Sequence, residues 1–488
     1  MLFNSFEFLI FLPLVFSIYW AINFNIKYQN LFLVLASYIF YGWWDWRFLS
    51  LIIISTLSDF YIGIALSKYN KQSKRKILLW LSIFINIGLL GFFKYYNFFI
   101  DNFVEAFSFF GKKISPRSLT IILPVGISFY TFQTLSYSID VYKRKLNPSK
   151  DLITFSAFIS FFPQLVAGPI ERATNLLPQF RVKRTFKYST AVDGLRQILW
   201  GFFKKVVIAD TCAIYANLIF NDYTNYSGIA LFFGAVLFAF QIYGDFSGYS
   251  DIAIGTSRLF GFNLMQNFNF PYFSRDIAEF WRKWHISLST WFRDYVYIPL
   301  GGSKGSRYNK LRNVFVIFLI SGFWHGANWT FITWGLINAL YFIPLLFFKK
   351  NRQNVNLISM DRRLPTSKEF YQIIFTFILV SIAWIFFRSE NILNACYYLF
   401  LMFKGLVDKA GLIRVLDLLY FKIGLVFPIT FIVFLAFEWA GRSSKYALEK
   451  LFINKKSIFR RAIYYFIFLS IIFFSMNVEE QEFIYFNF

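Results

Sequence analysis

Long apolar runs separated by short polar stretches recur along the whole chain. Many of them approach the roughly 20 residues that an α-helix needs to cross a bilayer. The pattern predicts an all-α, multi-pass membrane protein with about 11 to 13 membrane segments, some of them re-entrant. We expect these segments at residues 5–23, 29–43, 48–67, 77–98, 118–139, 152–168, 192–218, 228–246, 313–324, 328–348, 370–387, 418–439 and 460–476.

The composition supports a membrane protein and excludes an ordinary soluble domain. Hydrophobic residues make up 57% of the chain, charged residues only 16%, and the mean hydropathy is +0.50. Soluble domains carry about 25% charged residues. The first apolar run, 5–23, has no basic residue before it and no small-residue cleavage site after it. It therefore reads as a retained first span rather than a signal peptide.

The net charge of +24 comes from short basic clusters between the apolar runs. This is the positive-inside pattern, in which each cluster marks a cytoplasmic loop, and it places the N-terminus outside. The expected partner of these clusters is membrane lipid rather than nucleic acid, although a charged cofactor such as coenzyme A would also meet them. The clusters lie at 68–76, 143–150, 181–187, 301–312 and 349–353.

Glycine and proline give residues 122–137 and 161–173 a broken character. Non-helical backbone survives at membrane depth only where protein or a wet cavity shields it. Residues 349–369 form the longest polar interruption, which we expect to be one exposed loop. The sequence has no internal repeat and no long linker, so residues 1–488 read as a single domain.

One of the two histidines of the chain, His285, lies in a stretch with helical spacing of apolar residues, 276–293. Trp281, Leu288 and Phe292 share its helix face, so this face should be apolar and should carry the histidine inward. The stretch is too charged to cross lipid. We expect one helix that lies in the interface or dips into the protein.

The other histidine, His325, has Gly322 and Gly326 on either side and apolar stretches beyond them. Glycine permits close approach of another backbone or a ligand, so the sequence predicts a thinned, bent place within a span. An ionisable group at membrane depth marks a candidate functional site, and a buried neutral imidazole suits a general base. The alternative is that each histidine simply bonds a buried carbonyl.

Carboxylates in apolar surroundings are the next candidates. Asp245 and Asp251 could bind a cation, assist the histidines, cap helices or pair with Arg258, because buried carboxylates need partners. Glu171 and Arg172 could pair with each other or anchor a loop.

Several kinds of site are absent from the sequence. The two cysteines, Cys212 and Cys396, give neither a disulfide framework nor a metal spacing. There is no glycine-rich phosphate motif, serine-nucleophile elbow or CxxC pair. We therefore expect no metal and no permanently bound cofactor, and no conventional ATPase or hydrolase site.

At these motifs the chain resembles the membrane-bound O-acyltransferases, most of all their bacterial branch of alginate and peptidoglycan O-acetyltransferases. The resemblance covers nearly the whole length. The matching stretches are "MLFNSFEFLIFLPLVF" (1–16), "LPVGISFYTFQTLSYSIDVY" (123–142), "FFPQLVAGPIERA" (161–173), "YGDFSGYSDIAIG" (243–255), "NFNFPYFSRDIAEFWRKWHISLSTWFRDYVYIPLGG" (267–302), "GFWHGANWTFITWG" (322–335) and "FIYFNF" (483–488).

The resemblance implies a ring of tilted helices around a tunnel, with His325 as the catalytic histidine and His285 at the second conserved polar position. We expect the tunnel to be lined by Trp281, Trp284, Trp324, Asn328, Asp245 and Ser289. Trp329 should join the tryptophans in the apolar wall. Asn328 would hold the developing oxyanion or, equally, hydrogen-bond the broken helix.

The same resemblance implies acetyl-coenzyme A as a cytoplasmic acyl donor and an extracytoplasmic partner protein or glycan as acceptor. The expected location is the bacterial cytoplasmic membrane. D-alanyl transfer to teichoic acid from a carrier-protein thioester is the alternative within the family. The extra helices after His325 favour the acetylating branch.

Two other classes remain as alternatives. A proton-coupled transporter would use histidine and aspartate as a relay, but it predicts inverted repeats that the sequence does not show. A catalytically idle membrane scaffold is the second. Against both, we expect His325 to act as general base towards an acceptor hydroxyl that attacks a thioester.

Overall fold

A computed structural model describes residues 1–109, 119, 121–359, 362–406, 424–451 and 456–484. Its regular elements there are all helices, which confirms the predicted all-α class. The chain divides into two compact units, one of residues 1–194 with 253–265 and the other of residues 195–252 with 266–488. The expectation of a single domain stays a prediction.

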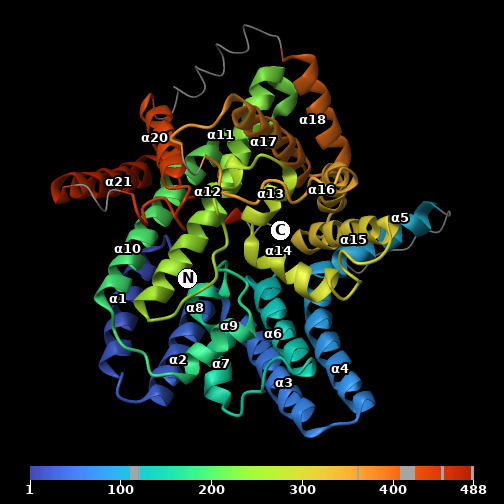
Figure 1. Cartoon of the computed structure of the whole chain (residues 1–488), viewed down its shortest axis with the longest axis vertical. Helices are drawn as coiled ribbons and strands as arrows, with labels where there is room; N and C mark the ends of the chain where they lie inside the picture. The colour runs from blue at the N-terminus through green and yellow to red at the C-terminus, as the bar shows by residue number, and fades with distance from the viewer. Residues whose placement is uncertain (110–118, 120, 360–361, 407–423, 452–455, 485–488) are drawn as a thin grey trace. The chain divides into compact units, whose positions relative to one another are not determined.

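The first unit is built around helices from the N-terminal third of the chain (Figure 1). Helix α2 packs on α7, and α3 packs on both α4 and α6. Its elements are α1 (Phe6–Ala21), α2 (Ile26–Asp45), η1 (Trp46–Phe48), α3 (Leu49–Lys68), α4 (Gln72–Leu90), η2 (Gly91–Tyr95), α5 (Tyr96–Phe109), α6 (Ile127–Tyr142), α7 (Leu152–Ser160), α8 (Phe162–Leu165), α9 (Ala173–Leu176), η3 (Leu177–Arg181) and the start of α10 (Tyr188–Phe202).

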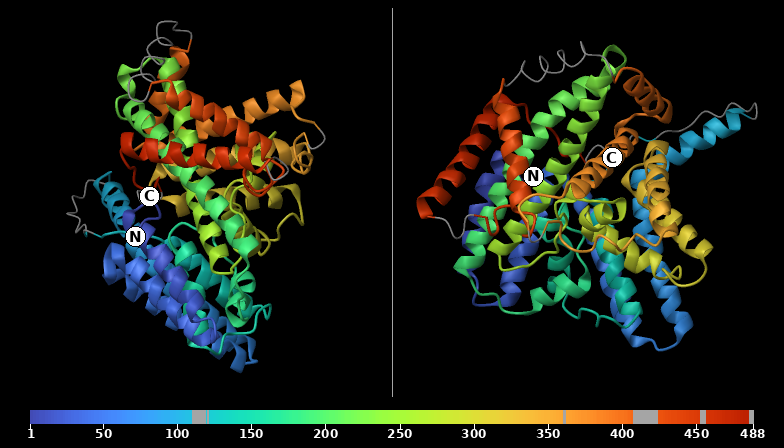
Figure 2. Two further views of the ribbon diagram at one scale, coloured as in Figure 1. Left: turned by 90° about the vertical axis from the view of Figure 1, so that its left-hand side faces the viewer. Right: turned by 45° about the horizontal axis from the view of Figure 1, so that its top comes forward.

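The second unit contains both histidines. Helix α12 is one continuous rod, as Figures 1 and 2 show. Its 32 residues make it about 48 Å long at 1.5 Å per residue. The elements that follow α10 are η4 (Phe203–Ala209), α11 (Asp210–Asn221), η5 (Tyr223–Asn225), α12 (Gly228–Leu259), η6 (Pro271–Phe273), α13 (Ile277–Lys283), α14 (Ile286–Phe292), η7 (Arg293–Tyr297), α15 (Arg307–His325), α16 (Trp329–Phe347), α17 (Ser367–Arg388), α18 (Ile392–Lys404), α20 (Val426–Ala440) and α21 (Ser457–Asn477). The last residues of α12, from Ala253 on, belong to the first unit.

Six helical stretches of the described residues are long and apolar enough to cross a membrane, which confirms a multi-pass membrane protein. The first, Ile26–Lys68, joins two of the predicted segments in one helical run. The other five are Gln72–Phe107, Gly228–Leu259, Trp329–Phe347, Ser367–Arg388 and Ser457–Asn477.

Two predictions about local breaks turned out differently. Residues 161–173 are broken as expected, since α8 ends at Leu165 and α9 begins only at Ala173. Residues 122–137 are broken only at their start, because residues 122–126 are not helical and α6 then runs without interruption from Ile127. Its glycine acts before the helix: Gly126 has φ +75°, and a Cβ there would lie 2.7 Å from the carbonyl oxygen of Leu165.

Helix α18 was not predicted as an element, because its 13 residues are too few for a spanning run. The loop predicted at 349–369 ends earlier than expected. Its last residues form a capping box, in which Thr366 and Glu369 exchange side-chain and backbone hydrogen bonds at the start of α17. The loop also contacts α13, because Arg282 donates hydrogen bonds to the carbonyl oxygens of Asn351 and Asn354 at 3.0 and 2.7 Å.

Helices α15 and α16 form a tightly packed antiparallel hairpin with His325 at its tip. Glycines at the crossing make this approach possible. A Cβ on Gly322 would lie 2.3 Å from the carbonyl oxygen of Phe331, and one on Gly335 would lie 2.3 Å from that of Phe318. The predicted close backbone approach at Gly322 is therefore confirmed, and the bend is a helix–helix turn.

Candidate functional site

The helix predicted over 276–293 is broken at His285, so the expectation of one continuous helix was wrong. His285 has left-handed backbone angles, φ 43° and ψ 54°, which a non-glycine residue adopts only where its surroundings impose them. Tertiary hydrogen bonds supply that constraint. The Asn269 N–H donates to the Lys283 carbonyl at 3.0 Å, and the Ile286 N–H donates to the Asn267 carbonyl at 2.8 Å.

The His285 ring is held by a buried amide. Its Nδ1 lies 3.0 Å from Oδ1 of Asn267, which also accepts from the Ser287 hydroxyl at 2.8 Å. The Asn267 amide nitrogen donates in turn to the Ser250 hydroxyl at 2.9 Å. Because Oδ1 can only accept, Nδ1 carries the proton in this network, and Nε2 of the neutral ring carries the lone pair.

Burial also decides the charge of this imidazole. The His285 side chain is 1% exposed, and desolvation lowers its pKa to about 3. Since burial penalises the charged form, the ring is neutral at physiological pH. A neutral ring with a fixed tautomer is able to accept a proton or a hydrogen bond at Nε2.

His325 closes α15 and is also buried, with 3% of its surface exposed. Aromatic rings surround it: the centroids of Trp334 and Phe387 lie 5.1 and 5.3 Å from the imidazole centroid. The turn behind it is tight, because a Cβ on Gly326 would lie 2.0 Å from the Phe331 ring. The hairpin therefore presents the imidazole to an apolar, water-poor space.

The two histidines are 40 residues apart in the chain, but the indole ring of Trp324 lies next to both imidazoles. The Trp324 centroid lies 6.1 Å from His285 and 4.9 Å from His325. Trp384 extends the cluster, because its ring stacks on Trp334 at 5.5 Å and lies tilted against Trp284 at 5.1 Å. Both imidazoles thus belong to one buried aromatic cluster, which we call the histidine cluster.

The tryptophans predicted to line a tunnel mostly lie in this cluster. Trp284 and Trp324 are buried, and the Trp281 ring lies 5.6 Å from that of Trp334. Trp329 does not join them. It begins α16 and is 52% exposed, so it lies outside the buried cluster and its predicted place in the apolar wall was wrong.

The side chains of Asn328 and Ser289 both form hydrogen bonds with backbone groups. The Asn328 side chain accepts from the Thr330 N–H at 3.0 Å and donates to the Glu390 carbonyl at 2.9 Å. It thus caps α16 and anchors the loop after α17, as in the second of its two expected roles. The half-buried Ser289 hydroxyl donates to the Trp284 carbonyl at 3.3 Å, beside the helix break.

Asp245 is paired with a cation that the sequence analysis missed. Its Oδ1 lies 2.9 Å from Nζ of Lys205, and its Oδ2 accepts from the Ile484 N–H at 2.6 Å. Lys205 also contacts Asp210 at 2.8 Å and donates to the Gln481 carbonyl at 2.8 Å. The carboxylate therefore fixes the C-terminal segment rather than the imidazoles.

Asp251 has a similar partner. Its Oδ2 lies 2.6 Å from Nζ of Lys204, and the predicted partner Arg258 instead pairs with Asp193 at 2.5 Å. The prediction of a paired carboxylate was right and the named cation was wrong. Two consecutive lysines inside the apolar run 192–218 are the signal that would have revealed both pairs.

Glu171 anchors a loop, which is one of its two expected roles. Its carboxylate accepts from the Asn175 amide at 2.7 Å and from the Met265 N–H. Among the residues that sequence reasoning missed, Asn267 is hydrogen-bonded to a histidine. A polar pair before the aromatic residues of "QNFNF" (266–270) was its only signal.

Comparison with known proteins identifies the family. Residues 38–387 match the model of the membrane-bound O-acyltransferase (MBOAT) family. A probable alginate O-acetylase, AlgI, of Pseudomonas putida is 40% identical over 80% of this chain and 78% of its own length. The peptidoglycan O-acetyltransferase of Helicobacter pylori is 34% identical over 84% of this chain and 80% of its own.

A third relative is more distant. The teichoic acid D-alanyltransferase of Bacillus subtilis is 28% identical over 51% of this chain and 64% of its own length. The family match includes both histidines and the glycines of the hairpin. This all-helical, multi-pass chain belongs to the membrane-bound O-acyltransferase family and is an O-acyltransferase.

Proposed function

We propose that the protein O-acetylates an extracytoplasmic polysaccharide, or a partner protein that passes the acetyl group on, with acetyl-coenzyme A as cytoplasmic donor. The observation that carries this proposal is the meeting of both histidines in one buried aromatic cluster. The relatives at 40% and 34% identity are named as O-acetylating enzymes, which favours acetyl over D-alanyl transfer. The bacterial cytoplasmic membrane is the location that fits such a donor and acceptor.

In the proposed reaction His325 is the general base. The imidazole takes the proton of the acceptor hydroxyl while the hydroxyl oxygen attacks the thioester carbonyl carbon. The C–S bond then breaks, and the imidazolium returns the proton to the leaving thiolate, so that an ester and a free thiol are formed. General-base assistance of this kind contributes about 10²- to 10⁴-fold in rate.

His285 has a different part. Its lone pair on Nε2 accepts a hydrogen bond and orients a reactant, because Asn267 holds the proton on Nδ1. The surrounding rings keep bulk water away from the activated acyl group and so limit hydrolysis.

A polar cavity favours acceptor entry from the side opposite the basic loops. The basic clusters 301–312 and 349–353 lie at the far ends of the α15–α16 hairpin from His325, and by the positive-inside pattern they mark the cytoplasm. At the C-terminal end of α17, directly after Phe387, Arg388 lines a polar cavity of about 560 Å³. Asn217, Asn221, Gln241, Glu480, Gln481, Glu482 and Ile484 complete its lining. Hydroxyl-bearing acceptors suit these amide and carboxylate groups.

Liposomes with the purified protein test this function. Acetyl-labelled coenzyme A is supplied on one side and a candidate polysaccharide or partner protein on the other. The enzyme moves the label onto the acceptor, a transporter would move an intact solute, and a scaffold would do neither. His325→Ala should abolish the transfer, whereas Trp329→Phe, at the exposed neighbour of the hairpin turn, should retain it. Equal transfer by the His325→Ala protein would refute the proposal.

A further inference from the structure

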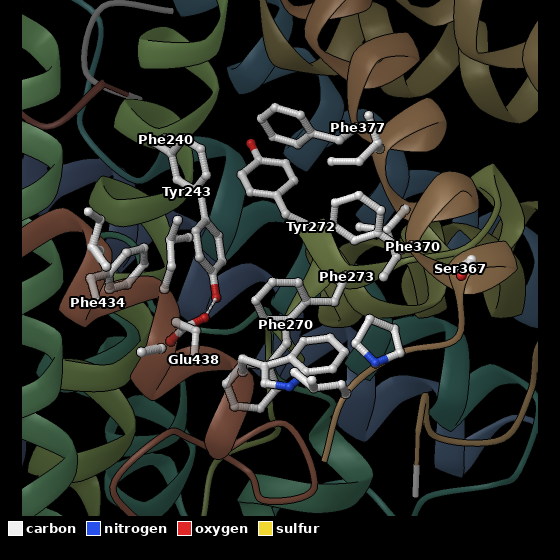
Figure 3. A pocket seen from close by; sticks show the side chains of 18 residues that line it. Phe240, Tyr243, Phe270, Tyr272, Phe273, Ser367, Phe370, Phe377, Phe434 and Glu438 are labelled. Atoms are coloured by element: carbon white, nitrogen blue, oxygen red, sulfur yellow. Dashed lines mark hydrogen bonds between the residues drawn. The ribbon is translucent and has the colours of Figure 1, made fainter. Parts of the chain in front are cut away.

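A large apolar cavity of about 840 Å³ lies within the second unit, between α12, α17, α20 and the segment around η6 (Figure 3). Its size is that of a ligand site, for which roughly 300–1,000 Å³ is usual. Aromatic and aliphatic side chains make up most of the wall. Figure 3 shows Tyr243 and Glu438 on one side, and Phe370 and Phe377 on the other.

The two tyrosines and the glutamate in this wall are bonded to the protein itself. The Tyr243 hydroxyl donates to Oε2 of Glu438, whose Oε1 accepts from the Trp200 indole at 3.1 Å. The Tyr272 hydroxyl donates to the Ala239 carbonyl at 2.6 Å. With these groups engaged, the cavity offers chiefly hydrocarbon contacts, which suit a hydrocarbon chain better than a sugar or a nucleotide.

The cavity has the depth of one membrane leaflet. Its α17 wall runs from Ser367 to Phe377, which is about 15 Å at 1.5 Å per residue, or half of a hydrocarbon core about 30 Å thick. Its rim is open to the outside of the helices, since Phe370, Ile374 and Ile432 are 58, 43 and 66% exposed. On a membrane-spanning helix such exposed apolar side chains face lipid.

Charges at the α17 N-terminus indicate which lipid. Arg363 and Lys368 are exposed there, directly beside the lining residues Leu364 and Ser367. The indole of Trp439 donates to the Arg363 carbonyl at 2.8 Å, in the manner of tryptophans at the membrane interface. Two cations at the interface end of a one-leaflet cavity complement an anionic headgroup.

We propose that this cavity binds one anionic phospholipid of the cytoplasmic leaflet, with an acyl chain inside and the phosphate at Arg363 and Lys368. Bilayer lipid is as apolar as the cavity, so selectivity comes from the headgroup charge and from filling a space that side chains leave open. The chain would lie against Tyr243 and Tyr272, whose rings are 6.2 and 5.9 Å from Trp284 of the histidine cluster. The bound lipid thereby supports one wall of that cluster.

Photo-cross-linking tests this site. The purified full-length protein is placed in nanodiscs that contain phosphatidylglycerol with a diazirine in mid-chain, and the cross-linked peptides are mapped. The label should concentrate on 367–377 and 432–439. Ala436→Trp, which fills the cavity, should reduce labelling there about tenfold, and Leu469→Trp, on the exposed face of α21, should leave it unchanged.

A second pair of variants tests the headgroup. Combined Arg363→Gln and Lys368→Gln should remove the preference for phosphatidylglycerol over phosphatidylcholine carrying the same diazirine, whereas Arg461→Gln, at the exposed basic start of α21, should preserve it. Unchanged cross-linking in Ala436→Trp, or equal labelling of the unaltered protein by both lipids, would overturn the proposal. Size-exclusion profiles and thermal unfolding of each variant show that it is folded. The outcome does not depend on acetyl transfer.

Discussion

The amide oxygen of Asn267 lies 3.0 Å from Nδ1 of His285 and 2.8 Å from the hydroxyl of Ser287. All three side chains are buried. The backbone carbonyl of the same asparagine accepts a hydrogen bond from the Ile286 N–H, directly after the helix break. One side chain therefore fixes the tautomer of an imidazole, and its backbone fixes the turn that presents it. This relationship makes Asn267 a positioning residue for the proposed chemistry.

Asn267→Ala should lower kcat for acetyl transfer by about 10- to 100-fold, the loss that is typical when the hydrogen-bond partner of a metal-binding histidine is removed. The reason is that Nδ1 loses its acceptor and the tautomer is no longer imposed. Asn267→Asp should restore part of the rate, because a carboxylate also accepts from Nδ1. Its negative charge should raise the pKa of His285 and shift the acid limb of the pH–rate profile upward. An alanine variant with unchanged kcat and an unchanged profile would contradict this role.

The stability of the protein should fall in acid partly because of His285. Its pKa is about 3 when folded and 6.5 when exposed, so the unfolded chain binds the extra proton below about pH 6.5. Stability is therefore complete above that pH and declines as the pH falls towards 3, with a slope of about 1.4 kcal/mol per pH unit from this group. His285→Gln removes the titrating group. In thermal unfolding between pH 7 and pH 4, the variant should lose less stability than the unaltered protein.

The sequence predicted the hairpin better than the helix break. Gly322 and Gly326 are a local signal that another part of the chain approaches the backbone closely, and in the structure Phe331 does so. The break at His285 depends on two backbone hydrogen bonds, one donated by Asn269 and one accepted by Asn267. Both residues lie outside 276–293, so the apolar periodicity of that stretch could not predict the break. Membrane segments were found because length and apolarity are local properties. The lysine partners of Asp245 and Asp251 were missed because pairing is a tertiary property.

Gly322→Ala should push α15 and α16 apart, because the new Cβ would meet the Phe331 carbonyl oxygen at 2.3 Å. Overpacking of this kind costs about 1–3 kcal/mol, and it should also displace His325, three residues further on. We expect both a lower unfolding temperature and a loss of acetyl transfer. Gly88→Ala in α4 is the matched control, since its Cβ would meet nothing within 4 Å, and it should be neutral or slightly stabilising. Similar behaviour of the two variants would show that the hairpin is not tightly constrained.

The charge network of Lys205 should hold the C-terminal segment next to His285. Lys205 bonds the Gln481 carbonyl and Asp245, and Asp245 bonds the Ile484 N–H. Between these anchors, the ring of Phe483 lies 6.0 Å from that of Phe246, which lies 4.6 Å from the imidazole of His285.

Lys205→Met leaves the carboxylates of Asp210 and Asp245 buried without their cation, a change that costs about 3–5 kcal/mol. The variant should unfold at a lower temperature and expose residues 479–484 to limited proteolysis. Adding Asp245→Asn to Lys205→Met should recover part of the stability, because one uncompensated charge is removed. It should not restore the position of the segment, because the lysine that bonds Gln481 is still missing.

Unfolding of the single variant at the temperature of the unaltered protein, with an intact C-terminal segment, would mean that the network does not anchor it. Because the anchored Phe483 contacts Phe246 beside His285, loss of the segment should also reduce acetyl transfer more than the exposed control Arg461→Gln does.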